Sequence, residues 1–194
     1  MHTPHRHVLI LTALAAALVL LSCAREPEWP GAFEGGFRLP NRWVLTPAGN
    51  HIPVGDLPLN MAWSIDSTLL AVTNNGYTRQ FVSIIDAARD TVIAELGVEK
   101  SFFGLAFSRD GSRLYASGGA DNTVLVWRVE GASFTPEPPI RLREPNTPRP
   151  FPAGIAVAPG DSLLFVAGNL DNCLAVAPVD TTLAVRRLKV GPYP

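Results

Sequence analysis

Three segments of the chain repeat one pattern of small, apolar and turn-forming residues. The segments are MAWSIDSTLLAVTN at residues 61–74, LAFSRDGSRLYASG at residues 105–118 and IAVAPGDSLLFVAG at residues 155–168. They align on Ala62, Ala106 and Ala156, which lie 44 and 50 positions apart. Because each copy of an internal repeat is one supersecondary unit, this spacing constrains the fold more than any single motif does.

Each repeat divides into four expected strands, which we call a, b, c and d in chain order. The expected ranges are 59–64, 68–73, 81–86 and 91–96 in the first repeat, 103–108, 112–117, 123–129 and 139–143 in the second, and 153–158, 162–167, 173–177 and 183–189 in the third. Asp and Gly between strands a and b supply the local hydrogen bond and permissive backbone of a tight turn. Four short strands in a period of 40–50 residues are typical of a propeller blade. We therefore predict an all-β fold: a partial β-propeller of about three and a half four-stranded antiparallel blades in an open arc.

The repeat also assigns residues to the interior. The anchor alanines suit the crowded axis where strands a of neighbouring blades converge. Five apolar residues of strands b are expected to fill the spaces between adjacent blades: Leu70, Leu114, Leu164, Val72 and Val166. Burying one such side chain stabilises the fold by about 1.5–3 kcal/mol.

The same alignment sets the expected boundaries. Residues 42–194 form the partial propeller, with blades at 58–101, 102–149 and 150–190 and the start of a further blade at 191–194. RWVLT-PAGN-HIPV within residues 42–57 parallels FVSIID-AARD-TVIAEL, so it is expected to form the outer two strands of a closing blade. KVGPYP at the end of the sequence aligns with PVGDLPLNMA, which leads into the first repeat, so the chain is expected to be an N-terminal fragment of a longer propeller.

The N-terminus is typical of an exported protein. VLILTALAAALVLL at residues 8–21 is an apolar run of 14 residues, which is too short to span a bilayer but suits a signal peptide. Leu20-Leu21-Ser22-Cys23 resembles a bacterial lipobox. We expect a lipoprotein signal peptide helix over residues 1–22, lipidation at Cys23, a tether over residues 23–41, and anchoring to a bacterial cell envelope.

The repeat carries a family resemblance. GLAFSRDGSRLYASGGADNTVLVW and VSIIDAARDTVIAELGV resemble the YVTN-type, YncE-like seven-bladed propeller repeat, over about residues 42–194. LPNRWVLTPAGNHIPVGDLPLNMAWS looks closer to a subgroup in which a lipoprotein propeller precedes an alkaline-phosphatase-superfamily phosphoesterase domain. VLVWRV is more distantly similar to the WD40 repeat, with Arg128 where that repeat has Asp.

No catalytic or metal-binding motif stands out. Removal of a signal peptide leaves His51 as the one histidine, and HExxH, CxxC, GxSxG and P-loop patterns are missing. We therefore expect no catalytic residue, no metal and no cofactor in this part of the protein. The formal net charge of −1 gives no basic field for nucleic acid.

The candidate binding residues belong to two groups. One group lies in the polar loops between strands b and c, and the other consists of aromatic residues just before strands a. The candidates are Asn75, Tyr77, Asp121, Asn122, Asp171, Asn172, Phe102 and Phe151. The Asx oxygens suit a ligand or a hard cation, but local backbone hydrogen bonding is the favoured interpretation. The phenylalanines suit either a recognition surface or packing between blades.

Two functions follow from these features. The first is an exported, lipid-anchored module that binds a protein or small molecule at the propeller rim. The second is the accessory propeller of a phosphoesterase whose catalytic domain lies outside these residues, so an enzymatic role of the full-length protein is left open. With three and a half blades, exposed apolar blade faces are expected to promote association.

Overall fold

The chain forms two compact units, Met1–Gly49 and Asn50–Pro194. The computed structural model describes residues 29–142, 149–192 and 194. The expected signal peptide at 1–22 and the lipidation site Cys23 lie outside the described residues.

The first unit contains a three-stranded antiparallel sheet. Its strands are β1 (Gly31–Phe33), β2 (Gly36–Arg38) and β3 (Val44–Leu45), in the order β1-β2-β3. Phe33 pairs with Gly36 across a two-residue turn, and Gly35 has a φ of 83° there. Positive φ in such a turn favours glycine. Two strands therefore lie in the range expected to be a tether.

The hairpin expected over residues 42–54 is wrong. Val44 and Leu45 pair with β2 instead of with residues 51–54, and residues 51–54 form no strand. Pro53 has no N–H to donate to a neighbouring strand. The hairpin of β1 and β2, in contrast, gives β3 a partner only a few residues away in the sequence.

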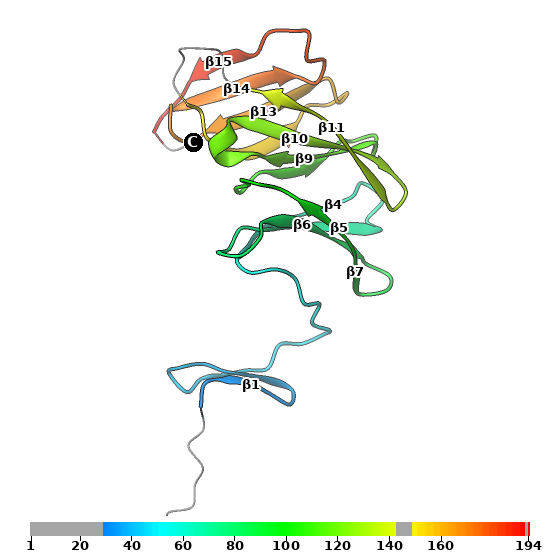
Figure 1. Ribbon diagram of the computed structural model, residues 1–194, viewed down its shortest axis with the longest axis vertical. Coiled ribbons are helices and arrows are strands. Elements are labelled where there is room, and N and C mark those ends of the chain that lie inside the picture. The colour runs from blue at the N-terminus through cyan, green and yellow to red at the C-terminus, as the bar shows by residue number, and fades with distance from the viewer. Residues whose placement is uncertain (1–28, 143–148, 193) are drawn as a thin grey trace, which may run out of the picture. The chain divides into compact units, whose positions relative to one another are not determined.

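The second unit contains three four-stranded antiparallel sheets (Figure 1). The first sheet contains β4 (Pro58–Trp63), β5 (Leu69–Asn74), β6 (Phe81–Asp86) and β7 (Thr91–Gly97). The second contains β8 (Leu105–Phe107), β9 (Arg113–Ser117), β10 (Thr123–Glu130) and β11 (Ser133–Arg141), with a short 3-10 helix η1 (Gly119–Asp121) before β10. The third contains β12 (Pro152–Val157), β13 (Leu163–Gly168), β14 (Cys173–Pro178) and β15 (Arg186–Lys189). Each sheet keeps chain order across its width, and the inner strand β8 lies beside β4 and β12.

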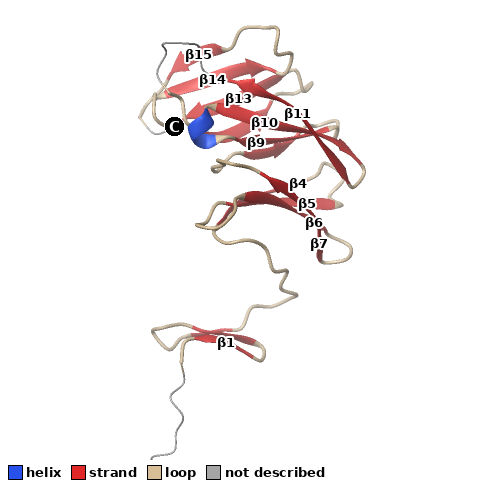
Figure 2. Ribbon diagram, in the orientation of Figure 1, coloured by secondary structure: helices blue, strands red, loops and turns tan. Residues whose placement is uncertain are grey.

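These strands follow the expected a-b-c-d pattern in all three repeats (Figure 2). The largest difference is β11, which begins at Ser133 although the sequence placed the second strand d at 139–143. This strand contains Pro136, Pro138 and Pro139. It tolerates them because it is an edge strand that pairs with β10 alone, and proline is compatible with the unpaired side of an edge.

Apolar side chains fill the spaces between neighbouring sheets. Leu69, Val82, Ile84, Leu105, Leu114 and Trp127 belong to the cluster between the first and second sheets. Tyr115, Val124, Ile140, Leu164, Val166 and Ala175 belong to the cluster between the second and third sheets. Leu114, Leu164 and Val166 therefore lie where the repeat predicted them. Leu70 and Val72 point to the opposite side of the first sheet, away from the second.

Candidate binding edge

All eight predicted site residues lie at one edge of the three sheets, which we call the loop edge. It consists of the loops between strands b and c (74–80, 118–122 and 168–172) and the segments before the inner strands (97–104 and 149–151). In an antiparallel sheet these connections leave from the same side. Hydrogen bonds and ring contacts join them from one sheet to the next, so the loop edge is continuous in the described part of the chain.

Hydrogen bonds hold the loop at residues 74–80 on both sides of an exposed aromatic residue, Tyr77. Thr78 donates to Asp56 from its hydroxyl at 2.6 Å and from its backbone N–H at 3.3 Å. The hydroxyl bond is the main cause that lowers the pKa of Asp56. Asn75 donates from Nδ2 to the Ser101 hydroxyl in the next segment. Tyr77, between these anchors, is fully exposed.

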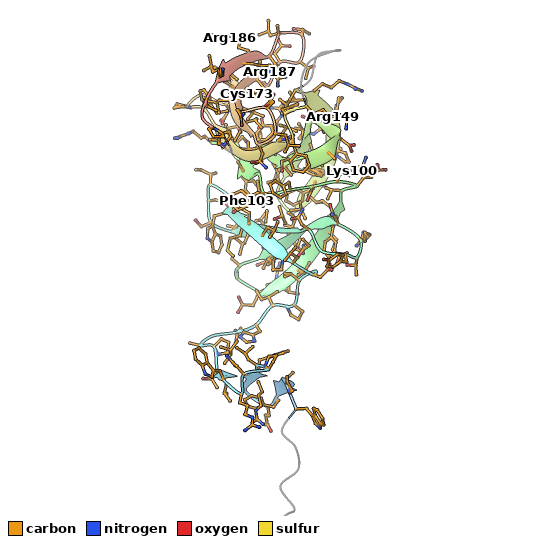
Figure 3. The ribbon with its side chains drawn as sticks, turned by 90° about the vertical axis from the view of Figure 1, so that its left-hand side faces the viewer. Lys100, Phe103, Arg149, Cys173, Arg186 and Arg187 are labelled. Atoms are coloured by element: carbon orange, nitrogen blue, oxygen red, sulfur yellow. The ribbon has the colours of Figure 1, made fainter. Side chains whose placement is uncertain are left out.

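Asp121 is held by a lysine that sequence reasoning missed. Lys100 Nζ lies 2.7 Å from Asp121 Oδ1, and both side chains are about half exposed. Their hydrogen bond raises the pKa of Lys100. The pair joins the segment before β8 to the loop after β9 and leaves charge accessible to solvent; Lys100 is labelled in Figure 3.

Asn122 is a structural connector. It has a left-handed φ of 59°, a conformation that asparagine adopts more readily than most residues. Its Nδ2 donates to the Ala120 carbonyl at 2.9 Å, and its Oδ1 accepts from the Phe151 N–H at 3.2 Å. Both ends of the amide are engaged: the bond of Nδ2 is local, as expected for an asparagine in a loop, whereas the bond of Oδ1 reaches a residue 29 positions away.

Phe102 and Phe151 pack against each other. Their ring centroids are 5.3 Å apart at an interplanar angle of 66°, which is an edge-to-face contact. Both residues are half-buried. Their rings therefore join the segments before β8 and β12, and part of each side chain remains exposed at the loop edge.

Asp171 is buried and paired with another residue that the sequence did not single out. Its side chain is 3% exposed and forms an ion pair with Arg187 of β15. Arg187 also donates to the Leu142 carbonyl at 3.3 Å and to Cys173 Sγ at 3.5 Å; Arg187 and Cys173 are labelled in Figure 3. Asn172 has a φ of 53°, and its carbonyl accepts from the Val190 N–H at 2.9 Å. Asp171 therefore contributes to the sheet's structure rather than to an open ligand site.

A hollow of about 830 Å³ lies at the opposite edge, between the turns of the first and second sheets. Its lining includes Asp66, Asp86 and Asp110. Each carboxylate is already used by its own turn: Asp66 accepts from Ser64 and Thr68, Asp86 from Ala88 and Arg89, and Asp110 from Ser108 and Ser112. The three carboxylates that line the hollow therefore already accept hydrogen bonds within their own turns.

Among residues 29–142, 149–192 and 194, no group of three or more His, Cys, Asp or Glu side chains is arranged to hold a metal ion. The same part of the chain has no helix with the length and apolar character to cross a bilayer.

Comparison with known proteins adds evidence on the fold. No family model matches the chain, and no curated protein sequence matches it significantly. The chain is similar to hydrazine synthase of Kuenenia stuttgartiensis, with a TM-score of 0.54 and 20% identity over 75% of this chain and 39% of that one. It is similar to the RRP9 WD40 repeats, with a TM-score of 0.52 and 20% identity over 66% and 36%. It is also similar to the Cps50 (Swd1) β-propeller domain of Myceliophteria thermophila, with a TM-score of 0.52 and 16% identity over 72% and 40%.

The fold is that of a β-propeller. The expected fold class, an all-β partial propeller with four-stranded antiparallel blades, is confirmed. At these identities the likeness concerns the fold alone. The chain spans less than half the length of each of these three structures.

Proposed function

We propose that this protein is an exported, lipid-anchored propeller module that binds a protein or small-molecule partner through the loop edge. Tyr77 carries the proposal, because it is fully exposed on a loop that Asp56 and Ser101 hold in place. Binding surfaces are enriched in tyrosine, and a loop ordered before binding loses less entropy when a partner docks. The ion pair of Lys100 and Asp121 adds accessible charge along the same edge.

Membrane attachment rests on the N-terminal sequence. The apolar run at residues 8–21 and the lipobox-like Leu20–Cys23 favour cleavage before Cys23 and acylation of its thiol. Incorporation of a fatty-acid alkyne into the wild-type protein but not into Cys23→Ala would support the anchor. Equal membrane partitioning of the two proteins would contradict it.

Site-specific photo-crosslinking tests the loop edge. A photoreactive phenylalanine analogue replaces Tyr77 in one preparation and Arg89, which lies in the turn between β6 and β7 at the opposite edge, in a matched control. We expect a discrete crosslinked product from position 77 that position 89 does not give. Identical products from both positions, or none from position 77, would overturn binding at the loop edge.

A second candidate is an accessory role within a larger phosphoesterase. The YncE-like character of LPNRWVLTPAGNHIPVGDLPLNMAWS supports it, as does the fact that the chain spans under half of the propellers to which it is similar. Reading the gene beyond codon 194 tests this candidate. An open frame that encodes further blades and a domain rich in metal-binding Asp and His favours it, whereas a stop codon after the blades favours the binding module.

A further inference from the structure

The three-stranded sheet of the first unit, which we call the first-unit sheet, has an apolar face without a covering layer in that unit. Its strands β1, β2 and β3 form a single antiparallel layer (Figure 1). Ala32, Phe37 and Leu45 lie opposite one another in these strands, so they form one row on one face. Phe37 and Leu45 are 52% and 45% exposed. A sheet buries an apolar face against another layer, so this row is suited to contact a partner.

Two tryptophans flank the strands of the first-unit sheet. Trp29 lies two positions before β1 and is 77% exposed, and Trp43 immediately precedes β3 and is 70% exposed. On the face opposite the Phe37 row, the Arg38 guanidinium lies 5.8 Å from the centroid of the Phe33 ring. Tryptophan is enriched where a bilayer meets water, because its ring is apolar and its indole N–H is polar. The side chains of the first-unit sheet therefore suit the headgroup region of a bilayer.

The covalent chain keeps this sheet close to a lipid surface. The inference rests on the proposed acylation of Cys23, which places that residue at the bilayer interface. Trp29 follows Cys23 by six residues, and six residues span at most about 20 Å even when fully extended. A lipid surface is therefore within reach of the first-unit sheet in every anchored molecule, whereas any other partner has to be brought to it.

Charge contributes little to this contact. Residues 23–49 contain three basic and three acidic side chains, namely Arg25, Arg38, Arg42, Glu26, Glu28 and Glu34. Their formal charges cancel, so attraction to anionic headgroups is weak. Binding of a surface element to a bilayer then depends on its apolar and aromatic area, and the contact should persist at high salt.

We propose that the first-unit sheet docks on the bilayer that holds the acylated Cys23, with the Phe37 row and the two flanking tryptophans at headgroup level. The acyl chains attach the protein, and the sheet adds a second point of contact that restricts the orientation of the first unit. A weak intrinsic affinity is sufficient, because a short link to an anchored residue gives the sheet a high effective concentration at the surface.

Quenching of tryptophan fluorescence by brominated lipids tests the contact. The lipidated full-length protein is reconstituted into phosphatidylcholine vesicles whose acyl chains carry bromine close to the headgroup, or no bromine. We expect brominated lipid to quench the wild type, and this quenching to be lost when Trp29→Phe and Trp43→Phe are combined. Trp63→Phe is the reporter control, because Trp63 is 53% exposed in β4 of the second unit. Loss of quenching in Trp63→Phe, with none in the double variant, would overturn the proposal.

A charge on either face of β3 tests which face docks. Leu45→Asp places a carboxylate in the Phe37 row and should abolish the quenching of Trp29 and Trp43, because a charge is costly to bury without a partner. Val44→Asp is the matched control, since Val44 is 47% exposed in the same strand but pairs with Arg38 on the opposite face. It should be quenched as the wild type is, also in about 1 M salt. Equal quenching of the two variants would overturn docking through the Phe37 row.

The failure of docking is distinguishable from the failure of the anchor. Fatty-acid alkyne incorporation at Cys23 is measured in the same preparations. A labelled wild type whose tryptophans brominated lipid does not quench would overturn docking, leave the anchor intact and indicate that protein covers the sheet. A wild type that incorporates no fatty acid would overturn the anchor and, with it, the docking that rests on it. Crosslinking from Tyr77 reports on the loop edge independently of both results.

Discussion

The carboxylate of Asp161 accepts a hydrogen bond from the backbone N–H of Arg109 at 2.7 Å, although 52 residues separate them. The adjacent Asp110 N–H donates to the same carboxylate at 2.9 Å. Asp161 lies in the turn between strands a and b of the third sheet, and Arg109 lies in the equivalent turn of the second. The third repeat has Ala158 and Gly160 where the second has Ser108 and Asp110. Its aspartate, Asp161, stands one position later and is engaged by the neighbouring turn.

Replacement of Asp161 tests how much this bridge stabilises the stacked sheets. Asp161→Gly should lower the free energy of unfolding by about 1–3 kcal/mol, because two backbone donors lose a charged acceptor. Glycine also suits the φ of 56° at this position, so the loss reports on the hydrogen bonds. Asp161→Ala should cost about 1 kcal/mol more, since alanine resists a left-handed backbone. Urea denaturation measures both, and wild-type stability of the glycine variant would contradict the bridge.

Stability should depend on the ionisation of Asp110. The Ser108 hydroxyl donates to this carboxylate at 2.6 Å and, with the Ser112 N–H and hydroxyl, lowers the pKa of Asp110. An unfolded aspartate titrates at about pH 3.9. Because the folded pKa lies below that value, the stabilising contribution is complete above about pH 4 and is lost as the pH falls through the folded pKa.

Asp110→Asn should therefore lower stability at pH 6 and have a smaller effect near pH 3, as measured by urea denaturation at both values. Ser108→Ala removes the largest cause of the shift and should reduce the same pH dependence part of the way. An unchanged difference in stability between pH 6 and pH 3 in the Asn variant would refute a role for this carboxylate.

The sequence predicted the strands well because the relevant signals are local. The Asp66 and Asp110 turns, the spacing of the anchor alanines and the alternation around Leu114 and Leu164 each act within one repeat. Strands a, b and c consequently begin within about two residues of their expected positions in all three repeats.

The sequence predicted the roles of the site residues less well because their partners come from elsewhere. Asp171 pairs with Arg187 across a sheet, and Asp121 pairs with Lys100 from a preceding segment. In the sequence, the only sign of these ion pairs was a basic residue just before strand a (Lys100) or within strand d (Arg187). Lysine and arginine are too common on protein surfaces for that sign to identify the partner of an aspartate. Residues 42–54 were misassigned because the competing partner, β2, lay in a segment interpreted as a tether.

Tyr115 offers a stabilising substitution. Its side chain is completely buried, and its hydroxyl has no hydrogen-bond partner among the residues that the structure describes. Burial raises the pKa of Tyr115 to about 12. Because an unpaired buried hydroxyl costs about 1–3 kcal/mol, Tyr115→Phe should raise the free energy of unfolding by about 1 kcal/mol. Trp127→Phe, which shortens a buried side chain of the other cluster, should lower it and serves as the opposite control.

The thiol of Cys173 should be protected in the folded protein. It is 5% exposed, and burial raises its pKa. The thiolate is the reactive form, so alkylation requires both a higher pH and an opening of the third sheet. In a chain with Cys23→Ala, Cys173 is the remaining cysteine, and iodoacetamide at pH 8 should modify it at least about 100-fold more slowly than a free thiol. A Tyr77→Cys control in the same background should react rapidly at its exposed position, and fast modification of Cys173 without denaturant would contradict the burial of its thiol in the third sheet.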